Sequence, residues 1–287
     1  MNEAPTWAEF VQGWELGVYS PPVLCGVVAG LVLGAIGVFV VLRRMVFVTV
    51  ALSQASGLGV ALSFFAGIHL GIDVHPVVGA LAITLATAAL FIVRTDRLGL
   101  SKEGLLGLIY LGTWAASIIV GEKIAQEAHD IAGILFGTAV LVEPIDVVLV
   151  VTVGAVVLAV HALFHRGLVF VAFDPVGAEV QGLPVRVLDL TGWVLLALEV
   201  SVATRALGVL PVFAFAVLPA MAALTVIRRR IRWVLVLAAA LGALSGGAGY
   251  LAAFFLELPV GASQAAVAVV LFLASLLYRL IAGRDRG

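Results

Sequence analysis

Nine long apolar stretches follow one another along this 287-residue sequence, and they limit what the chain can fold into. A transmembrane helix needs roughly 20 mainly apolar residues, and the stretches have about that length. Only 11% of the residues are charged, against roughly 25% in soluble domains. We therefore predict an all-α polytopic membrane protein with about nine spans, near Val23–Leu42, Met45–Ile68, Pro76–Val93, Gly104–Val120, Ile145–Phe164, Val187–Ala206, Val209–Ile227, Trp233–Leu256 and Gly261–Ile281.

The same composition excludes several functional classes. A chain with 63% hydrophobic residues is not a soluble enzyme with a bound cofactor. The net charge is −1 and the basic residues form small clusters at the ends of apolar runs, which excludes nucleic acid as a partner. Cys25 is the only cysteine, so the chain forms no intramolecular disulfide. The sequence lacks a GxxxxGKS/T loop, so we expect no cofactor in this chain and ATP with Mg²⁺ on a partner subunit.

Basic residues are distributed very unevenly between alternate loops. Cytoplasmic loops of membrane proteins collect lysine and arginine. If the N-terminus lies outside, only Lys123 and Arg205 of the 16 basic residues fall on the outer side. The outer loops then hold mostly acidic residues. We therefore predict nine spans with the N-terminus outside and the C-terminus inside.

The N-terminal segment, residues 1–20, does not resemble a cleavable signal peptide. It contains three glutamates and no basic residue, whereas a signal peptide begins with positive charge. Trp7, Phe10 and Trp14 fall near helical spacing, which suits a helix lying against the bilayer surface. We predict an extracytoplasmic, interfacial segment, followed by a single transmembrane domain over residues 21–287.

One inner loop, residues 165–186, is too long to be a simple turn. It reads HRGLVFVAFDPVGAEVQGLPVR. Asp174 followed by Pro175 is typical of a helix start, and Gly182 followed by Pro184 is typical of a helix end. A helix of about two turns is not stable alone in water. We therefore expect it to dock on its own bundle or on a partner.

A family resemblance is carried by four separated blocks: FVVLRRMVFVTVALSQASGLGVAL, AFDPVGAEVQGLPVRVLDL, ALGVLPVFAFAVLPAMAAL and FFLELPVGASQAAVAVVLFLASLL. In order and approximate spacing they resemble the metal-type permeases of ABC importers, which are the membrane subunits for zinc, manganese or iron uptake. The resemblance runs from about Val23 to Leu280. It implies a fold similar to cobalamin-importer permeases, a prokaryotic inner membrane location and a homodimer. It also implies two cytoplasmic ATP-binding subunits and an extracytoplasmic substrate-binding protein.

The inner loop is predicted to contact the ATP-binding subunit, because its short helix is cytoplasmic, capped and too short to be stable alone. The residues expected to couple the two subunits are Asp174, Ala178, Glu179 and Gly182. We expect the short helix to sit in a cleft of the ATPase. A bulky charged residue in place of Ala178 is then expected to uncouple transport while the permease stays folded.

The second span departs from the family at two positions. Zinc and manganese members usually have an aspartate and, four residues later, a histidine near its start, where this sequence has Val50 and Gln54. The i, i+4 spacing places such a pair on one helix face, where it suits a divalent ion. Valine offers no donor atom and an amide oxygen is a poor zinc ligand. The cargo therefore stays open between zinc or manganese held by other ligands, iron, and a chelated metal.

Polar groups inside the spans are costly, so each needs a reason. Ser53 and Gln54 are expected to line the translocation path, and the alternative is hydrogen bonding between close-packed helices. Glu199 lies deep within the sixth apolar stretch and is expected to serve the path or its gate. The alternatives for Glu199 are an ion pair with Arg205 or a protonated acid bonded to a neighbouring helix.

Two outer loops hold clusters of metal-ligand groups, at His69, Asp73 and His75 and at His129 and Asp130. Imidazole and carboxylate suit Zn²⁺ or Mn²⁺, which predicts metal capture there. Neither cluster has a recognised ligand spacing, and solvated loop residues are the alternative. His161 and His165 are four residues apart near the inner end of the fifth span. They indicate either a metal exit site or an interfacial pair at the lipid headgroups.

Two further patterns concern the packing of the spans. Glycines at helical spacing predict close helix contact in the first and eighth spans, at Gly30, Gly34 and Gly37 and at Gly242, Gly246 and Gly249. Pro211 and Pro219 raise the alternative of a broken half-span. Broken helices with a midplane acid are typical of secondary transporters and channels, which is the alternative functional class. Copurification of a separate ATPase discriminates between the two classes.

Overall fold

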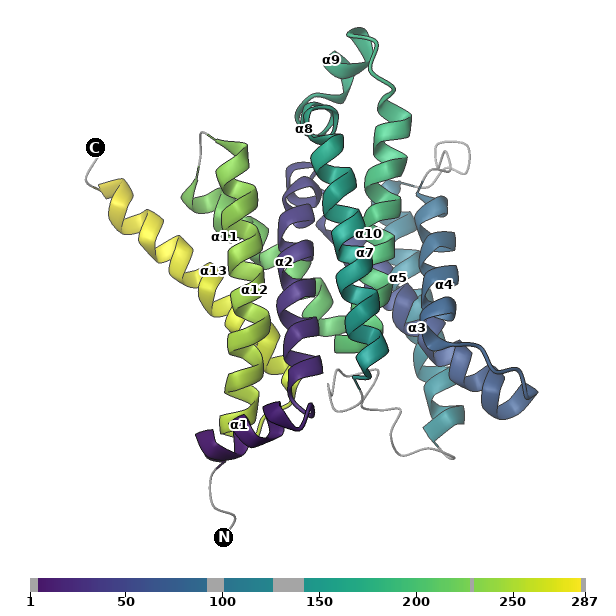
Figure 1. The fold of residues 1–287 in the computed structure, drawn as a ribbon. Coiled ribbons are helices and arrows are strands. Elements are labelled where there is room, and N and C mark those ends of the chain that lie inside the picture. The colour runs from purple at the N-terminus through teal and green to yellow at the C-terminus, as the bar shows by residue number, and fades with distance from the viewer. Residues whose placement is uncertain (1–4, 92–100, 126–141, 228–229, 285–287) are drawn as a thin grey trace.

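The computed structural model describes residues 5–91, 101–125, 142–227 and 230–284, and it is helical throughout (Figure 1). These residues form twelve α-helices and no strand. The all-α membrane class predicted from the sequence is confirmed. The helices are α1 (Trp7–Glu15), α2 (Ser20–Leu42), α3 (Val46–Leu70), α4 (Pro76–Leu90), α5 (Lys102–Ala125), α7 (Pro144–Leu163), α8 (His165–Phe173), α9 (Pro175–Val180), α10 (Val185–Leu207), α11 (Val209–Val226), α12 (Ile231–Leu256) and α13 (Val260–Arg284).

Eight of the described helices are long and apolar enough to cross a membrane, namely α2, α3, α5, α7 and α10 to α13. The ninth apolar helix, α4, has 15 residues and ends beside a stretch outside the described residues. Each predicted span thus contains one helix, while the count of nine crossings stays a prediction. The two termini lie at opposite ends of the bundle, and α9 lies at the end of the C-terminus (Figure 1). The predicted topology requires this arrangement, and its sidedness stays a prediction.

The seventh predicted span, α11, is one continuous helix, so the broken half-span considered from its prolines does not form. Pro211 lies in the first turn, where a backbone N–H has no helical partner in any case. Pro219 lies inside the helix and is buried, and α11 packs against α2, α12 and α13. Packing of neighbouring helices offsets the hydrogen bond that a proline removes in a membrane bundle.

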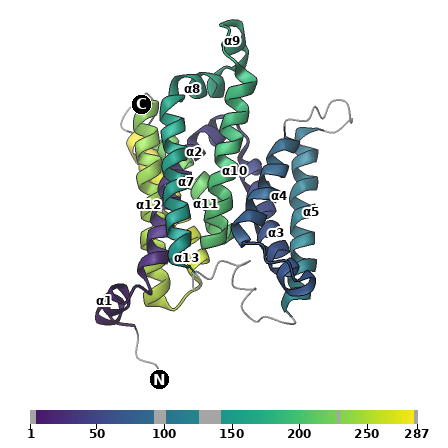
Figure 2. The same ribbon diagram turned by 45° about the vertical axis from the view of Figure 1, so that its right-hand side comes forward.

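Helix α2 lies at the centre of the described bundle and packs against α7, α10, α11 and α12 (Figure 2). The backbones of α2 and α12 touch each other, which confirms the close helix contact predicted from the spacing of the glycines. A Cβ atom added to Gly242 would lie 2.7 Å from the carbonyl carbon of Gly30. One turn away, a Cβ atom on Gly246 would lie 2.9 Å from the backbone nitrogen of Val27. Larger residues here would force the two helices apart.

The N-terminal helix α1 lies across one end of the bundle (Figure 1). It begins with a capping box, in which the Thr6 hydroxyl accepts from the Glu9 N–H and the Glu9 carboxylate accepts from the Thr6 N–H. Trp7 packs on Phe255 at the end of α12, with ring centroids 4.6 Å apart. A helix therefore forms in the predicted N-terminal segment, and its position at the membrane surface stays a prediction.

Candidate translocation path and coupling hairpin

Glu199 of α10 is fully enclosed within the bundle, with 0% of its surface exposed. Its carboxylate faces α7, because a Cβ atom on Gly154 would lie 3.5 and 3.7 Å from its two oxygens. The same added atom would lie 2.8 Å from Val32 of α2. Neither carboxylate oxygen has a hydrogen-bond partner among the described residues. Glu199 is therefore a desolvated acid in a space that the missing side chain of Gly154 leaves open.

Arg205 does not pair with Glu199, so that alternative is wrong. Its guanidinium binds the carboxylate of Asp146 at the start of α7, with 3.2 Å between Nη1 and Oδ2. Both side chains are buried. Asp146 also accepts a hydrogen bond from the Glu143 N–H, at 3.0 Å, and thereby completes a capping box. Arg205, which was predicted for the outer side, thus forms a buried pair with Asp146 that joins α10 to α7.

The two path candidates on α3 have different surroundings. Ser53 is completely buried, and its hydroxyl has no partner in the part of the chain that the structure describes. Gln54 is half-buried, as are Val50 and Leu58, which lie four residues before and after it. This spacing places the three on one face of α3, while most of the helix is buried. Gln54 is partly accessible in the single chain, as a residue that lines a path would be. Glu199 is enclosed and does not reach an open surface, so its role in the path stays a prediction.

The first outer cluster is explained locally by helix packing and capping. His69 stacks on Phe65, with ring centroids 4.4 Å apart. His75 caps α4, because its Nδ1 accepts a hydrogen bond from the Val77 N–H at 3.3 Å. Asp73 is exposed between them. These roles do not require a metal ion.

The second outer cluster, His129 and Asp130, lies outside the described residues. Within the residues that are described, no group of three or more His, Cys, Asp and Glu side chains is arranged to hold a metal. Metal capture at the outer loops therefore stays a prediction.

His161 and His165 do not share a helix, because α7 ends before α8 begins at His165. His161 is buried, and its Nδ1 lies 3.1 Å from the carbonyl oxygen of Val157. His165 lies at the edge of the bundle near Arg232 and Arg166. Partial burial lowers the pKa of His165, and the positive charges of Arg232 and Arg166 lower it further.

The inner loop forms two helices where the sequence predicted one. The predicted start is confirmed, because the Asp174 carboxylate accepts a hydrogen bond from the Gly177 N–H at 2.8 Å. The predicted stop is confirmed as well, since Gly182 adopts a left-handed φ of 79° just after α9. The preceding helix α8 was missed, although Leu168 and Val171 at i, i+3 mark its buried side. We call α8 and α9 together the coupling hairpin.

Ala178 is not available to a partner, which corrects the expected uncoupling substitution. Its side chain is 0% exposed and lies in a cluster with Leu168, Val171 and Leu188. A bulky charged residue there would disrupt the coupling hairpin itself. Exposed positions on α9 and its flanks are Phe173, Asp174, Pro175, Val176, Glu179, Val180, Gln181 and Gly182.

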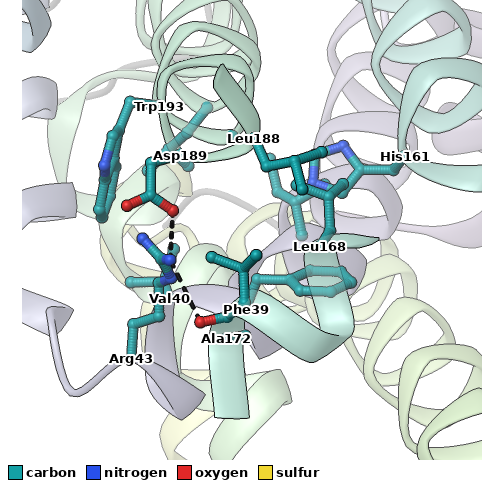
Figure 3. A pocket seen from close by; sticks show the side chains of 13 residues that line it. Phe39, Val40, Arg43, His161, Leu168, Ala172, Leu188, Asp189 and Trp193 are labelled. Atoms are coloured by element: carbon teal, nitrogen blue, oxygen red, sulfur yellow. Dashed lines mark hydrogen bonds and ion pairs between the residues drawn. The ribbon is translucent and has the colours of Figure 1, made fainter. Parts of the chain in front are cut away.

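An ion pair connects the base of the coupling hairpin to α2. Arg43 at the end of α2 pairs with Asp189 of α10, and its guanidinium also donates to the Val171 carbonyl of α8 at 3.4 Å. Figure 3 shows Arg43 pointing to Asp189, with Trp193 alongside. These side chains and His161 line a cavity of about 40 Å³. This pair was not predicted, because its members are 146 positions apart and no local sequence pattern connects them.

Gln264 of α13 is a second buried polar residue that sequence analysis missed. It is 0% exposed, and its Nε2 donates to the carbonyl of Gly246 on α12 at 3.1 Å. An amide side chain inside the last apolar stretch is the sequence feature that could have pointed to it. The hydrogen bond of Gln264 connects α13 to α12.

The known proteins that are similar to this chain are membrane subunits of transport systems. Residues 18–279 match the ABC 3 transport family. The manganese transport system membrane protein MntC of Listeria innocua is 28% identical over 270 residues, which cover 94% of each chain. The manganese import system permease protein ScaB of Streptococcus parasanguinis is 30% identical over 271 residues, which cover 93% of each.

Solved structures agree with this similarity. A chain of PsaBC from Streptococcus pneumoniae in complex with Fab superposes with a TM-score of 0.82 at 27% identity, over 94% of this chain and 95% of that one. An inward-facing putative metal-chelate type ABC transporter superposes with a TM-score of 0.74 at 16% identity, over 96% and 91% of the two chains. The second likeness shows the shared fold alone.

Proposed function

This chain belongs to the ABC 3 transport family, and from that premise we propose that it moves manganese inward across the bacterial cytoplasmic membrane. It is the permease subunit of an ATP-driven ABC importer for a divalent metal and is not itself an enzyme, because a separate subunit hydrolyses ATP. An ATP-binding subunit and a substrate-binding protein are the partners that this family implies. The family match along residues 18–279 carries the proposal.

The donor chemistry on α3 supports manganese over zinc as the cargo. Gln54 offers an amide oxygen on the accessible face, and Ser53 and Ser56 offer hydroxyl oxygens without partners among the described residues. Oxygen donors suit Mn²⁺, whereas zinc sites are built mainly from nitrogen and sulfur ligands. The relatives named above are manganese transport proteins. A neutral oxygen donor holds the ion weakly, which suits passage.

We infer that a second copy of the chain completes the path. The face of α3 that carries Gln54 is open in the single chain, so one copy does not enclose an ion there. The most exposed spans are α5, which packs against α3, and α13, which packs against α11 and α12. Two copies that meet through these helices would cover the Gln54 faces and form a path between them.

The coupling hairpin is the proposed contact with the ATP-binding subunit. It projects beyond the bundle at the end where the C-terminus lies (Figure 1). Val176 and Val180 on α9 are 70% and 83% exposed, and exposed apolar groups gathered on one short helix are typical of a protein interface. Ala178 holds α9 against α8 and α10. Movement of α9 therefore passes to α10 and, through the ion pair of Arg43 with Asp189, to α2.

Reconstitution tests the cargo and the energy source together. The permease and its ATP-binding subunit are placed in vesicles and supplied with manganese, zinc, iron or a chelated metal. We expect uptake that requires ATP and prefers manganese, and we expect Gln54→Ala to reduce it. Uptake without ATP would indicate a secondary transporter or channel, and a preference for zinc or for a chelate would contradict the assigned cargo.

Two substitutions test the coupling hairpin. Val176→Asp combined with Val180→Asp places charge on the exposed apolar face of α9 and is expected to abolish copurification of the ATP-binding subunit. Leu16→Asp is the matched control, because Leu16 is 72% exposed at the opposite end of the bundle. If the ATP-binding subunit copurifies equally well with the two variants, the coupling hairpin is not part of the interface.

A further inference from the structure

An open groove of about 430 Å³ lies between α2, α7 and α12, on the outside of the bundle. Helix α2 packs against both of the other helices and forms the floor, and it lies between α12 and α7 in Figure 1. The volume falls within the range of about 300–1,000 Å³ that is usual for small-molecule sites. The walls are apolar and are formed by Ile36, Phe39, Leu158, Ala162, Leu235 and Val236. Such walls suit a hydrocarbon chain.

One end of the groove is basic. His165 and Arg232 line this end, and Arg166 lies close enough to His165 for its charge to lower the pKa of that imidazole. None of the described lining residues is acidic. Neither Arg166 nor Arg232 forms an ion pair within the described residues. Like charges brought together in this way repel, and an anion between them relieves the repulsion.

The basic end lies at the level expected for lipid headgroups. Arg232 is in the first turn of α12 on the predicted cytoplasmic side, and Trp233 beside it is 57% exposed. Tryptophan is enriched at membrane–water interfaces. Basic pockets between transmembrane helices on the cytoplasmic side hold anionic lipid headgroups.

We propose that this groove binds one anionic phospholipid of the cytoplasmic leaflet. An acyl chain lies along Phe39, Leu158 and Leu235, and the phosphate lies between His165 and Arg232. The apolar walls accept any lipid, so the charge at the basic end provides the selectivity. Ser53, Gln54 and Glu199, which are proposed for the metal path, do not line the groove, whereas His161 and His165, the pair considered above as an exit site, do line it. The lipid therefore lies apart from the path residues on α3 and α10, and it uses His165 for its headgroup.

Native mass spectrometry of the full chain with its ATP-binding subunit tests the proposal, using phosphatidylglycerol and phosphatidylcholine as probes. We expect phosphatidylglycerol to stay bound and phosphatidylcholine to be lost. Arg232→Gln should weaken phosphatidylglycerol binding about fivefold, because one basic residue near the membrane surface contributes about 1 kcal/mol. Ala162→Trp, at an exposed wall position, should fill the groove and remove binding. Inorganic phosphate has no acyl chain and should not displace the lipid.

Arg279→Gln is the matched control, because Arg279 is an exposed arginine on α13 away from the groove. It should leave phosphatidylglycerol binding unchanged. Equal binding of the two lipids would overturn the proposal. Equal weakening by Arg232→Gln and Arg279→Gln would overturn it as well, because general surface charge would then explain the effect. Full binding in Ala162→Trp, or displacement by inorganic phosphate, would show that the groove does not hold the chain.

Discussion

A single methyl group added at Gly242 is expected to disrupt the contact between α2 and α12. In Gly242→Ala the new Cβ atom would lie 2.7 Å from the carbonyl carbon of Gly30, and closer still to its oxygen. The opposing atoms belong to the backbone, so no side chain can rotate away and the helices have to separate. Overpacking a well-packed interior costs about 1–3 kcal/mol, and we expect the upper end of this range. At about 2–4 °C per kcal/mol, Tm should fall by about 6–12 °C.

Gly112→Ala on α5 is the matched control for this prediction. Apart from its chain neighbours and the nearby backbone of α5, no atom of the described residues lies within 4 Å of a Cβ atom added there. Replacing a glycine inside a helix stabilises by about 0.5–1 kcal/mol when the space is free, so Tm should rise by about 1–4 °C. Thermal unfolding of the purified proteins in one detergent, followed by tryptophan fluorescence, measures both variants. If Gly242→Ala unfolds at or above the wild-type temperature, the two backbones are not in contact.

Three further predictions concern charged groups. Arg205→Gln leaves the buried carboxylate of Asp146 unpaired and should destabilise the protein by about 3–5 kcal/mol, which the same thermal assay measures; an unchanged Tm would exclude the pair. Glu199→Gln should lower ATP-driven metal uptake sharply while the protein stays folded, because no hydrogen bond to a described residue is lost; normal uptake in vesicles would remove Glu199 from the path. Arg232→Gln removes a positive charge that helps to lower the pKa of His165, so this pKa should rise while burial still holds it below its usual value; an NMR titration that shows no rise would contradict the placement.

The transmembrane helices were predictable because length and hydropathy are local properties of the sequence. The coupling hairpin was predictable in part for the same reason, since Asp174 and Gly182 act within their own helix ends. The two prolines of α11 suggested a break that does not form, because Pro211 lies in the first turn, where no helical N–H is needed, and Pro219 is accommodated inside the packed bundle. A cap or a span is visible in a short window of sequence.

Contacts between distant segments were not predictable from one sequence. The burial of Ala178 depends on Leu188 of α10, and the partner of Arg205 lies on α7. Glu199 and Arg205 are six residues apart and therefore about 9 Å apart along the helix axis, so they meet α7 at different levels. Their opposite charges suggested a pair that this geometry does not form. The orientation of α7 against α10 decides which acid the arginine reaches.

The glycine contact also restricts how the protein can change shape. Because α2 and α12 touch through their backbones over several turns, neither helix can slide or rotate past the other without collision. The two therefore move as one rigid body. Helix α7 packs against α10 through side chains around Gly154 and through one ion pair near its end, whereas α2 and α12 meet backbone to backbone. We therefore predict that α2 and α12 keep their alignment to each other when the protein changes conformation and that other helices move around them.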